Sequence, residues 1–246
     1  DLNPKVAEQG FAEQLNKVGY KTSFIGKAHF ATSSTFQPTG TPECKHSSKQ
    51  FDSNWYGPYM GFKHVELMTL GHWYKEKGPT LPPEGQHFER FVFDEANGPE
   101  IFDLWHKPAK LGHGAAQTWH SSLPVAMHSS TWCGDRTVSF LNDQKEDEPF
   151  CTWVSFPDPH HPFDCPTPWS TMYNLDDIDL PHEGRKDLDI RPWGHKASLE
   201  KEPNLADPQL KFFRAKLSRS EDQSEIQLRE MTANYFGMIS LIDHNV

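Results

Sequence analysis

The chain has 246 residues, of which 35% are hydrophobic and 13% aromatic, so it can bury a core and is not typical of a disordered segment. Its formal net charge of −10 argues against nucleic acid as a partner, because phosphate binding needs a basic surface. No apolar run reaches the length of a membrane-spanning helix.

The first quarter of the chain predicts an α/β unit. A helix is expected from about residue 4 to residue 18, because apolar side chains recur there at helical spacing. These are Ala7, Phe11, Leu15 and Val18. After Gly19, which suits a helix end, residues 21–25 are typical of a short buried strand that stops at Gly26.

The middle of the chain is less regular. Residues 30–61 are rich in Ser, Thr, Pro and Gly and have no period, which indicates loop or insertion. Residues 64–68 form a candidate strand, and residues 71–120 carry no assignable pattern. A second helix is expected from about residue 123 to residue 144, with an apolar face formed by Trp132, Val138 and Leu141.

The last part of the chain contains the best strand candidate. Residues 150–156 are aromatic and β-branched and stop at Pro157. Residues 164–210 are Pro-rich and charged and predict a long surface excursion. A final helix begins at about Ser224, with apolar residues at alternating intervals of three and four, namely Leu228, Met231, Tyr235, Met238 and Ile242. The order of elements favours a layered α/β domain.

A lysine and a histidine follow the first strand directly. Lys27 and His29 are two residues apart, so on an extended segment both side chains project to the same side. Ligands of open α/β sheets gather at the carboxyl ends of strands, and a fixed cation beside an imidazole suits an anionic, tetrahedral substrate. Taken alone, the segment is more often a solvated lysine and a structural histidine, since short motifs match by accident.

Two adjacent histidines follow the best strand. The prolines of residues 157–162 stiffen the loop and thereby orient His160 and His161, which suit general acid–base work. A metal site is less favoured, because adjacent histidines diverge on an extended chain and one carboxylate, Asp158 or Asp164, does not complete a site. Taken alone, this segment also slightly favours a structural role for the histidines. Because the segment with Lys27 and the segment with His160 each follow a strand, however, the two can converge at one edge of the sheet.

Other chemistries find little support in the sequence. It contains neither a G-x-S-x-G nucleophile elbow nor a G-x-x-x-x-G-K-[ST] phosphate loop. None of the 4 cysteines sits in a C-x-x-C pair. Two disulfides are arithmetically possible, and reduced, mostly buried thiols are at least as compatible with the pattern.

Four segments, in order, resemble the sulfatase family. Residues 19–29 resemble its G-Y-x-T-x-x-x-G-K-x-H segment, and residues 150–163, which contain Pro159-His160-His161-Pro162, resemble its strand followed by P-H-x-P. Residues 128–141 resemble the helix between these motifs, and residues 229–243 resemble the helix before a late metal-ligand strand. The resemblance covers nearly the whole chain and is weakest over residues 31–120.

The resemblance implies the α/β/α sandwich of the alkaline phosphatase superfamily, with three layers and a mostly parallel sheet. It implies hydrolysis of a small-molecule or carbohydrate sulfate ester by a formylglycine, made from a cysteine, beside calcium or a similar divalent cation. By motif, Lys27 would contact the sulfate and the formylglycine, and His29 would hold the formylglycine hydroxyl. His160 would contact the sulfate or protonate the leaving oxygen, and His161 is the second choice for substrate binding.

The chain departs from the family pattern at the nucleophile. No cysteine here lies in C-x-P-x-R or C-x-A-x-R, since Cys165 precedes Pro-Thr-Pro-Trp and Cys133 precedes Gly-Asp-Arg. The early and late metal-ligand pairs are expected before residue 1 and after residue 246, so no metal ligand is assigned within the chain. Asp243 and His244 lie on the last predicted helix and are not taken as that pair.

Residues 1–246 are therefore expected to be part of one sulfatase catalytic domain, truncated at both ends, with loop-rich insertions at 31–120 and 164–220. We expect the chain by itself to be inactive. The alternatives are a phosphonate or phosphodiester hydrolase of the same superfamily, and a non-catalytic binding protein on this scaffold. The 14 histidines also leave open a metal-binding domain, which would bind metal without further residues.

Overall fold

The computed structural model describes residues 2–32, 37–71, 85–95, 98–181, 187–200, 204–208, 211 and 222–246. Its larger helices and strands are α1 (Phe11–Lys17), β1 (Lys21–Lys27), β2 (His64–Met68), α2 (His87–Arg90), α3 (Gly98–His106), β3 (Pro108–Lys110), β4 (His120–Ser121), α4 (Ser129–Asn142), β5 (Phe150–Ser155), α5 (Trp193–Ala197) and α7 (Glu225–Asn245). Short 3-10 turns cover Pro4–Gln9, Lys45–Gln50, Val125–Met127, Trp169–Thr171 and Leu175–Asp177, and a π turn covers Phe91–Glu95.

Three parallel strands form the central sheet. Their order is β2-β1-β5, with Lys27 beside Met68 of β2 and Gly26 beside Ser155 of β5. The predicted strands at 21–25, 64–68 and 150–156 are thus confirmed. Residues 22–26 of β1 are all buried, as expected of a central parallel strand covered on both faces. Because the strands are parallel, their carboxyl ends meet at one edge of the sheet.

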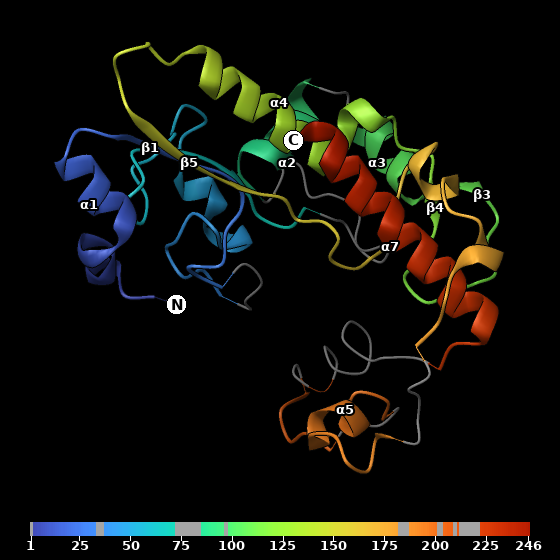
Figure 1. The fold of residues 1–246 in the computed structure, drawn as a ribbon. Coiled ribbons are helices and arrows are strands. Elements are labelled where there is room, and N and C mark those ends of the chain that lie inside the picture. Colours follow the sequence, from blue (N-terminus) through green and yellow to red (C-terminus); the bar gives the residue numbers. More distant parts are fainter. Residues whose placement is uncertain are drawn as a thin grey trace.

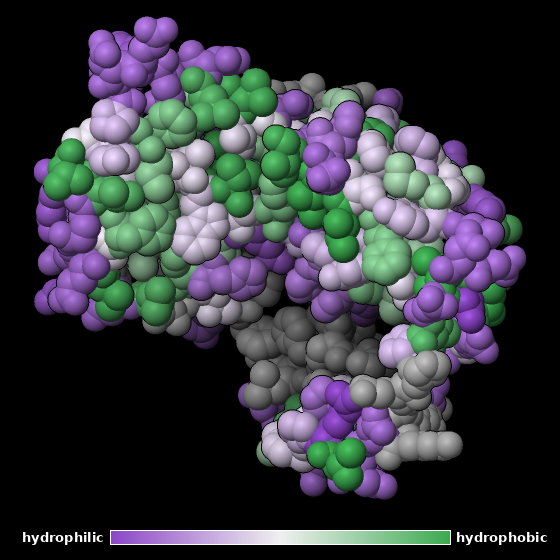
Figure 2. Space-filling view, in the orientation of Figure 1, coloured by the Kyte–Doolittle hydropathy of each residue, from purple (hydrophilic) through white to green (hydrophobic). Residues whose placement is uncertain are grey.

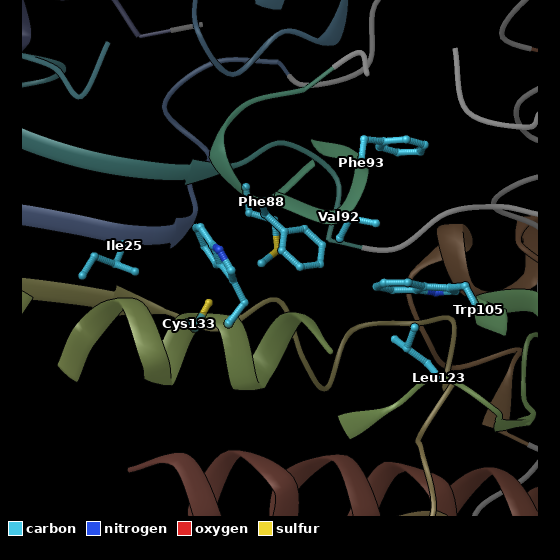
Figure 3. Packing of buried hydrophobic residues seen from close by; sticks show 9 residues of the cluster. Ile25, Phe88, Val92, Phe93, Trp105, Leu123 and Cys133 are labelled. Atoms are coloured by element: carbon cyan, nitrogen blue, oxygen red, sulfur yellow. The ribbon is translucent and has the colours of Figure 1, made fainter. Parts of the chain in front are cut away.

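Helices cover both faces of this sheet, which gives three layers (Figure 1). Successive side chains of β1 point to opposite faces. Phe24 therefore packs with Ala12 of α1, whereas Ile25 packs on the other side with Trp132 and Cys133 of α4. Figure 3 shows this second cluster, with α4 between the strands and α7. The expected α/β/α sandwich with a parallel sheet is confirmed for the described residues.

Two predicted helices differ from the observed ones. The helix expected over residues 4–18 is interrupted at Gly10, where an extended backbone separates a 3-10 turn from α1. The second helix begins only at Ser129, because His128 accepts the N–H of Ser130 as an N-cap. Of its expected apolar face, Trp132 is buried, but Val138 and Leu141 are exposed.

Helix α7 begins where predicted, at the N-cap Ser224, but it buries another face. Its buried residues are Glu230, Ala233, Asn234, Gly237, Met238 and Leu241, whereas the expected Leu228 and Tyr235 are exposed. The buried face differs because α7 packs against the polar backbone of irregular segments. Glu230 accepts the N–H of His113, and a Cβ on Gly237 would lie 2.5 Å from the carbonyl oxygen of Trp169.

The region that the sequence left unassigned supplies part of the core. Phe88 of α2 and Trp105 of α3 are fully buried in the cluster that contains Ile25. On the opposite side, Phe11 and Trp153 lie partly exposed with ring centroids 5.8 Å apart, and hydrophobic residues gather over α1 and β5 in Figure 2. No helix within the described residues is both long and apolar enough to cross a membrane.

Candidate functional site

Lys27 is the last residue of β1 and is held between two neighbouring strands. Ser155 of β5 donates a hydrogen bond from Oγ to the carbonyl oxygen of Lys27 at 2.8 Å. The preceding residue, Gly26, has φ +114°, and a Cβ there would lie 2.0 Å from the carbonyl oxygen of Ser155. Only glycine permits this approach of the two strands. The backbone that carries Lys27 is therefore fixed by β5.

Lys27 and His29 lie close together, as the sequence predicts. Burial lowers the pKa of the Lys27 ammonium, and the negative charges of Glu89 and Asp158 oppose that shift. His29 is exposed, and its pKa is lowered by partial burial and by the charge of Lys27. A cation and a mostly neutral imidazole thus share the rim at the end of β1, which suits the binding of an anion.

The loop after β5 presents its two histidines side by side. The imidazoles of His160 and His161 stack with centroids 4.2 Å apart, and both residues are exposed. The expectation that they diverge is wrong, because the loop turns at this point and the N–H of His160 donates to the carbonyl of Pro157. His160 Nδ1 lies 2.5 Å from the carbonyl oxygen of His161, so Nδ1 carries a hydrogen and donates it to that oxygen.

Asp158, in the same loop, is buried and faces the start of α4. Ser130 donates a hydrogen bond from Oγ to Asp158 Oδ2 at 2.5 Å, and His128 Nδ1 lies 3.6 Å from the same oxygen. The positive end of the α4 dipole favours the carboxylate form there. The sequence offered Asp158 as a possible metal ligand, but in the structure its carboxylate accepts the hydrogen bond from Ser130 and lies beside His128.

Glu89 supplies a second buried carboxylate at this edge, and the sequence did not reveal it. Its side chain accepts the backbone N–H groups of Thr69 and Leu70, directly after β2, and of Gln86. Burial raises the pKa of Glu89, and these N–H groups oppose the shift. The available signal was a glutamate three residues after Gln86, the spacing of a helix N-terminal capping box.

Asp243 and His244 lie on α7, as expected, with the His244 ring 5.2 Å from that of Trp169. The four cysteines are all described, and none is in a disulfide. Burial raises the pKa of both the Cys133 and the Cys165 thiols.

Among the described residues no group of three or more His, Cys, Asp or Glu side chains could hold a metal ion. The described side chains therefore do not fit a calcium site, and none of the four cysteines has the sequence context of a formylglycine precursor.

A separate cavity of about 340 Å³ lies at the opposite edge, near the amino ends of β1 and β2. Its central feature is an ion pair in which Arg136 Nη2 donates to Glu66 Oε1 at 3.1 Å. His64 Nε2 lies 3.1 Å from the same carboxylate, and its ring stacks on Phe140 at 5.9 Å. These contacts join β2 to α4, and none of the predicted site residues lines this cavity.

The sequence model of the Sulfatase family matches residues 3–246. An uncharacterized sulfatase of Escherichia coli (strain K12), YidJ, is 28% identical over 158 residues, which cover 62% of this chain and 30% of YidJ. The solved phosphonate monoester hydrolase of Agrobacterium radiobacter superposes with a TM-score of 0.59 at 16% identity, covering 96% of this chain and 42% of that chain. The enzyme SpPMH of Silicibacter pomeroyi gives 0.53 at 16% identity, covering 95% and 41%.

The chain thus spans less than half of the length of these relatives. The two superpositions establish the alkaline phosphatase-like fold. The family match extends over nearly all of the chain, and it includes both the strand that ends at Lys27 and the loop that holds His160. The chain belongs to the sulfatase family.

Proposed function

We propose that the full-length protein hydrolyses sulfate esters at the rim formed by the carboxyl ends of β1 and β5. The observation that carries this proposal is the register of the two strands. Gly26 pairs with Ser155, so Lys27 and the loop with His160 begin side by side. A cation and imidazoles gathered at a strand edge suit the charge that develops on a tetrahedral, anionic ester during hydrolysis.

In this proposal each rim residue has a distinct role. Lys27 binds a sulfate oxygen, and its ammonium offsets charge that grows on that oxygen. His29 orients the nucleophile by a hydrogen bond. His160 contacts the sulfate or protonates the leaving oxygen, and His161 contributes to substrate binding. A formylglycine would supply the nucleophile, and a calcium-type ion would stabilise the charge that develops beside it. We place both on residues outside this chain, since the described donors do not supply them.

The test is an assay of the full-length protein, matured to formylglycine, with an aryl sulfate. Replacement of Lys27 or of His160 by Ala is expected to reduce kcat/KM by about 100-fold or more, which is the usual contribution of a positioned acid or charge-stabilising group. His195→Ala is a matched control, because that histidine is exposed and lies on α5, which is far from β1 and β5 (Figure 1). If both rim variants retain the wild-type rate, the assignment of the site is wrong.

A second candidate is hydrolysis of phosphonate monoesters. The observation in its favour is that both solved relatives named above are phosphonate monoester hydrolases. Lys27 and His29 favour sulfate, because phosphonate and phosphodiester hydrolases of the superfamily often depart from the Lys-x-His pair. An aryl phosphonate ester in the same assay separates the two: faster phosphonate cleavage would replace the sulfatase proposal, and cleavage of neither would favour a binding role.

A further inference from the structure

A buried carboxylate is held near the carboxyl end of each strand that flanks β1, at the edge of the sheet where Lys27 ends β1. On one side, Met68 of β2 pairs with Lys27, and the next two residues donate their N–H groups to Glu89 at 2.9 Å each. On the other side, Asp158 follows three residues after Ser155, which binds the carbonyl of Lys27. The lysine therefore lies between two acids that come from different parts of the sequence.

Both carboxylates are fixed independently of Lys27. The Asp158 side chain is fully buried and accepts a hydrogen bond from the Ser130 hydroxyl at the amino end of α4, a helix of 14 residues. Glu89 is 1% exposed and is held by three backbone N–H groups. Buried carboxylates are stable as ions only with hydrogen bonds and a counter-charge, and the charge of each carboxylate interacts favourably with the Lys27 ammonium.

Lys27 needs these acids in turn. Burial favours its neutral form, which cannot bind a sulfate oxygen as a cation, and the acids on both sides favour the ammonium. The other described titratable groups around it do not supply negative charge. His29 is on its own segment and is affected by the charge of Lys27, and the thiol of Cys133 on α4 is kept neutral by burial and by Asp158.

We propose that Asp158 and Glu89 are positioning residues for Lys27. Their carboxylates hold the lysine side chain between them and keep it charged at the rim, where it meets the anionic substrate. The functional part of this inference rests on the proposed sulfate-ester hydrolysis, whereas the electrostatic part does not. In this proposal the two carboxylates act on the lysine through their charge, and they act on the reaction only through Lys27.

The experiment measures the charge of Lys27 directly in the full-length protein. Lysines are reductively methylated with ¹³C-formaldehyde, which keeps their charge, and the Lys27 signal is identified by its loss in Lys27→Arg. Asp158→Asn and Glu89→Gln keep the shape of each acid and remove its charge. Glu230→Gln is the matched control, because Glu230 is also buried and accepts a backbone N–H, from His113, but does not face Lys27.

We expect Asp158→Asn and Glu89→Gln each to lower the pKa of Lys27 by about one unit, the low end of the effect of an opposite charge within about 6 Å. Glu230→Gln leaves that pKa unchanged. An unaltered Lys27 pKa in the two variants, or an equal change in the control, overturns the inference. Wild-type protein gives a measurement without any variant: the Lys27 signal moves as the carboxylates protonate at acid pH, and a signal that does not move also overturns it.

Kinetics on an aryl sulfate then separate the two proposals. If the protein is a sulfatase, the basic limb of the kcat/KM profile moves to lower pH in Asp158→Asn by the same shift as the Lys27 pKa. A shifted pKa without any sulfate hydrolysis supports the positioning role and refutes the proposed function. Hydrolysis with a basic limb that stays in place refutes the role of Asp158 and leaves the function standing.

Discussion

Replacement of Gly26 by Ala tests whether the close approach of β1 and β5 builds the rim. Gly26 has φ +114°, and the added Cβ would lie 2.0 Å from the carbonyl oxygen of Ser155 and 3.3 Å from Cys133 Sγ. The obstacle at Ser155 is backbone and cannot rotate away. We therefore expect the strands to separate at the point where Lys27 leaves the sheet.

The magnitude follows from two costs. An L-residue in the left-handed region costs about 1–2 kcal/mol. Forcing one methyl group into a filled space costs a further 1–3 kcal/mol or so, because the backbone must shift and lengthen the hydrogen bonds of the ladder. Gly26→Ala should thus lower the free energy of unfolding by about 2–5 kcal/mol, a large part of the roughly 5–15 kcal/mol that stabilises an ordinary domain.

Gly19→Ala separates these two costs. Gly19 has φ +93°, and nothing lies within 4 Å of the position of its Cβ, so only the conformational cost of about 1–2 kcal/mol applies. Urea denaturation of both variants and of wild type gives the three free energies of unfolding. If Gly26→Ala is no more destabilising than Gly19→Ala, the contact with Ser155 does not constrain the strands, and the account of the rim given above fails.

Two further predictions concern buried histidine and helix capping. Burial lowers the pKa of His87 to about 4, so the free energy of unfolding should fall as pH drops from 6.5 towards 4, by about 3 kcal/mol in all, because only the unfolded chain takes up the proton. NMR titration of the His87 ring checks this, and a pKa near 6.5 would contradict it. Ser224→Ala removes the hydroxyl that accepts the N–H of Gln227 at the start of α7, and it should cost about 1 kcal/mol in urea denaturation. Thr232→Ala is its control, because the Thr232 hydroxyl bonds the carbonyl of Leu228 inside the same helix, and an equal loss there would argue against a capping effect.

The sheet was predictable because its signals are local. β1, β2 and β5 are short apolar or aromatic runs, bounded by Gly, Pro or polar residues, and each was found within two residues of its ends. The place of Lys27 at a strand end followed directly, and so did the position of His160 in the loop after β5. These residues depend on elements that the neighbouring sequence specifies.

The acids around Lys27 were not predictable because their partners are distant in sequence. Glu89 contacts residues 69 and 70 across a segment without periodicity, and Asp158 is held by Ser130, on a different helix. Apolar spacing was also misleading on α7. It measures where apolar residues fall, but the surface that α7 meets is partly polar backbone, which selects Glu230 and Gly237 instead of Leu228 and Tyr235.

The division between paired strands and irregular loops bears on how such a protein can evolve. Lys27 is fixed by the ladder and by the hydrogen bond from Ser155, whereas the segments that follow it, such as residues 37–63, have little regular structure. Insertions and substitutions in those loops can change the walls around a substrate while the cation stays in place. If the proposed hydrolysis takes place at this rim, variation in those loops would change the choice of substrate while Lys27 keeps its position.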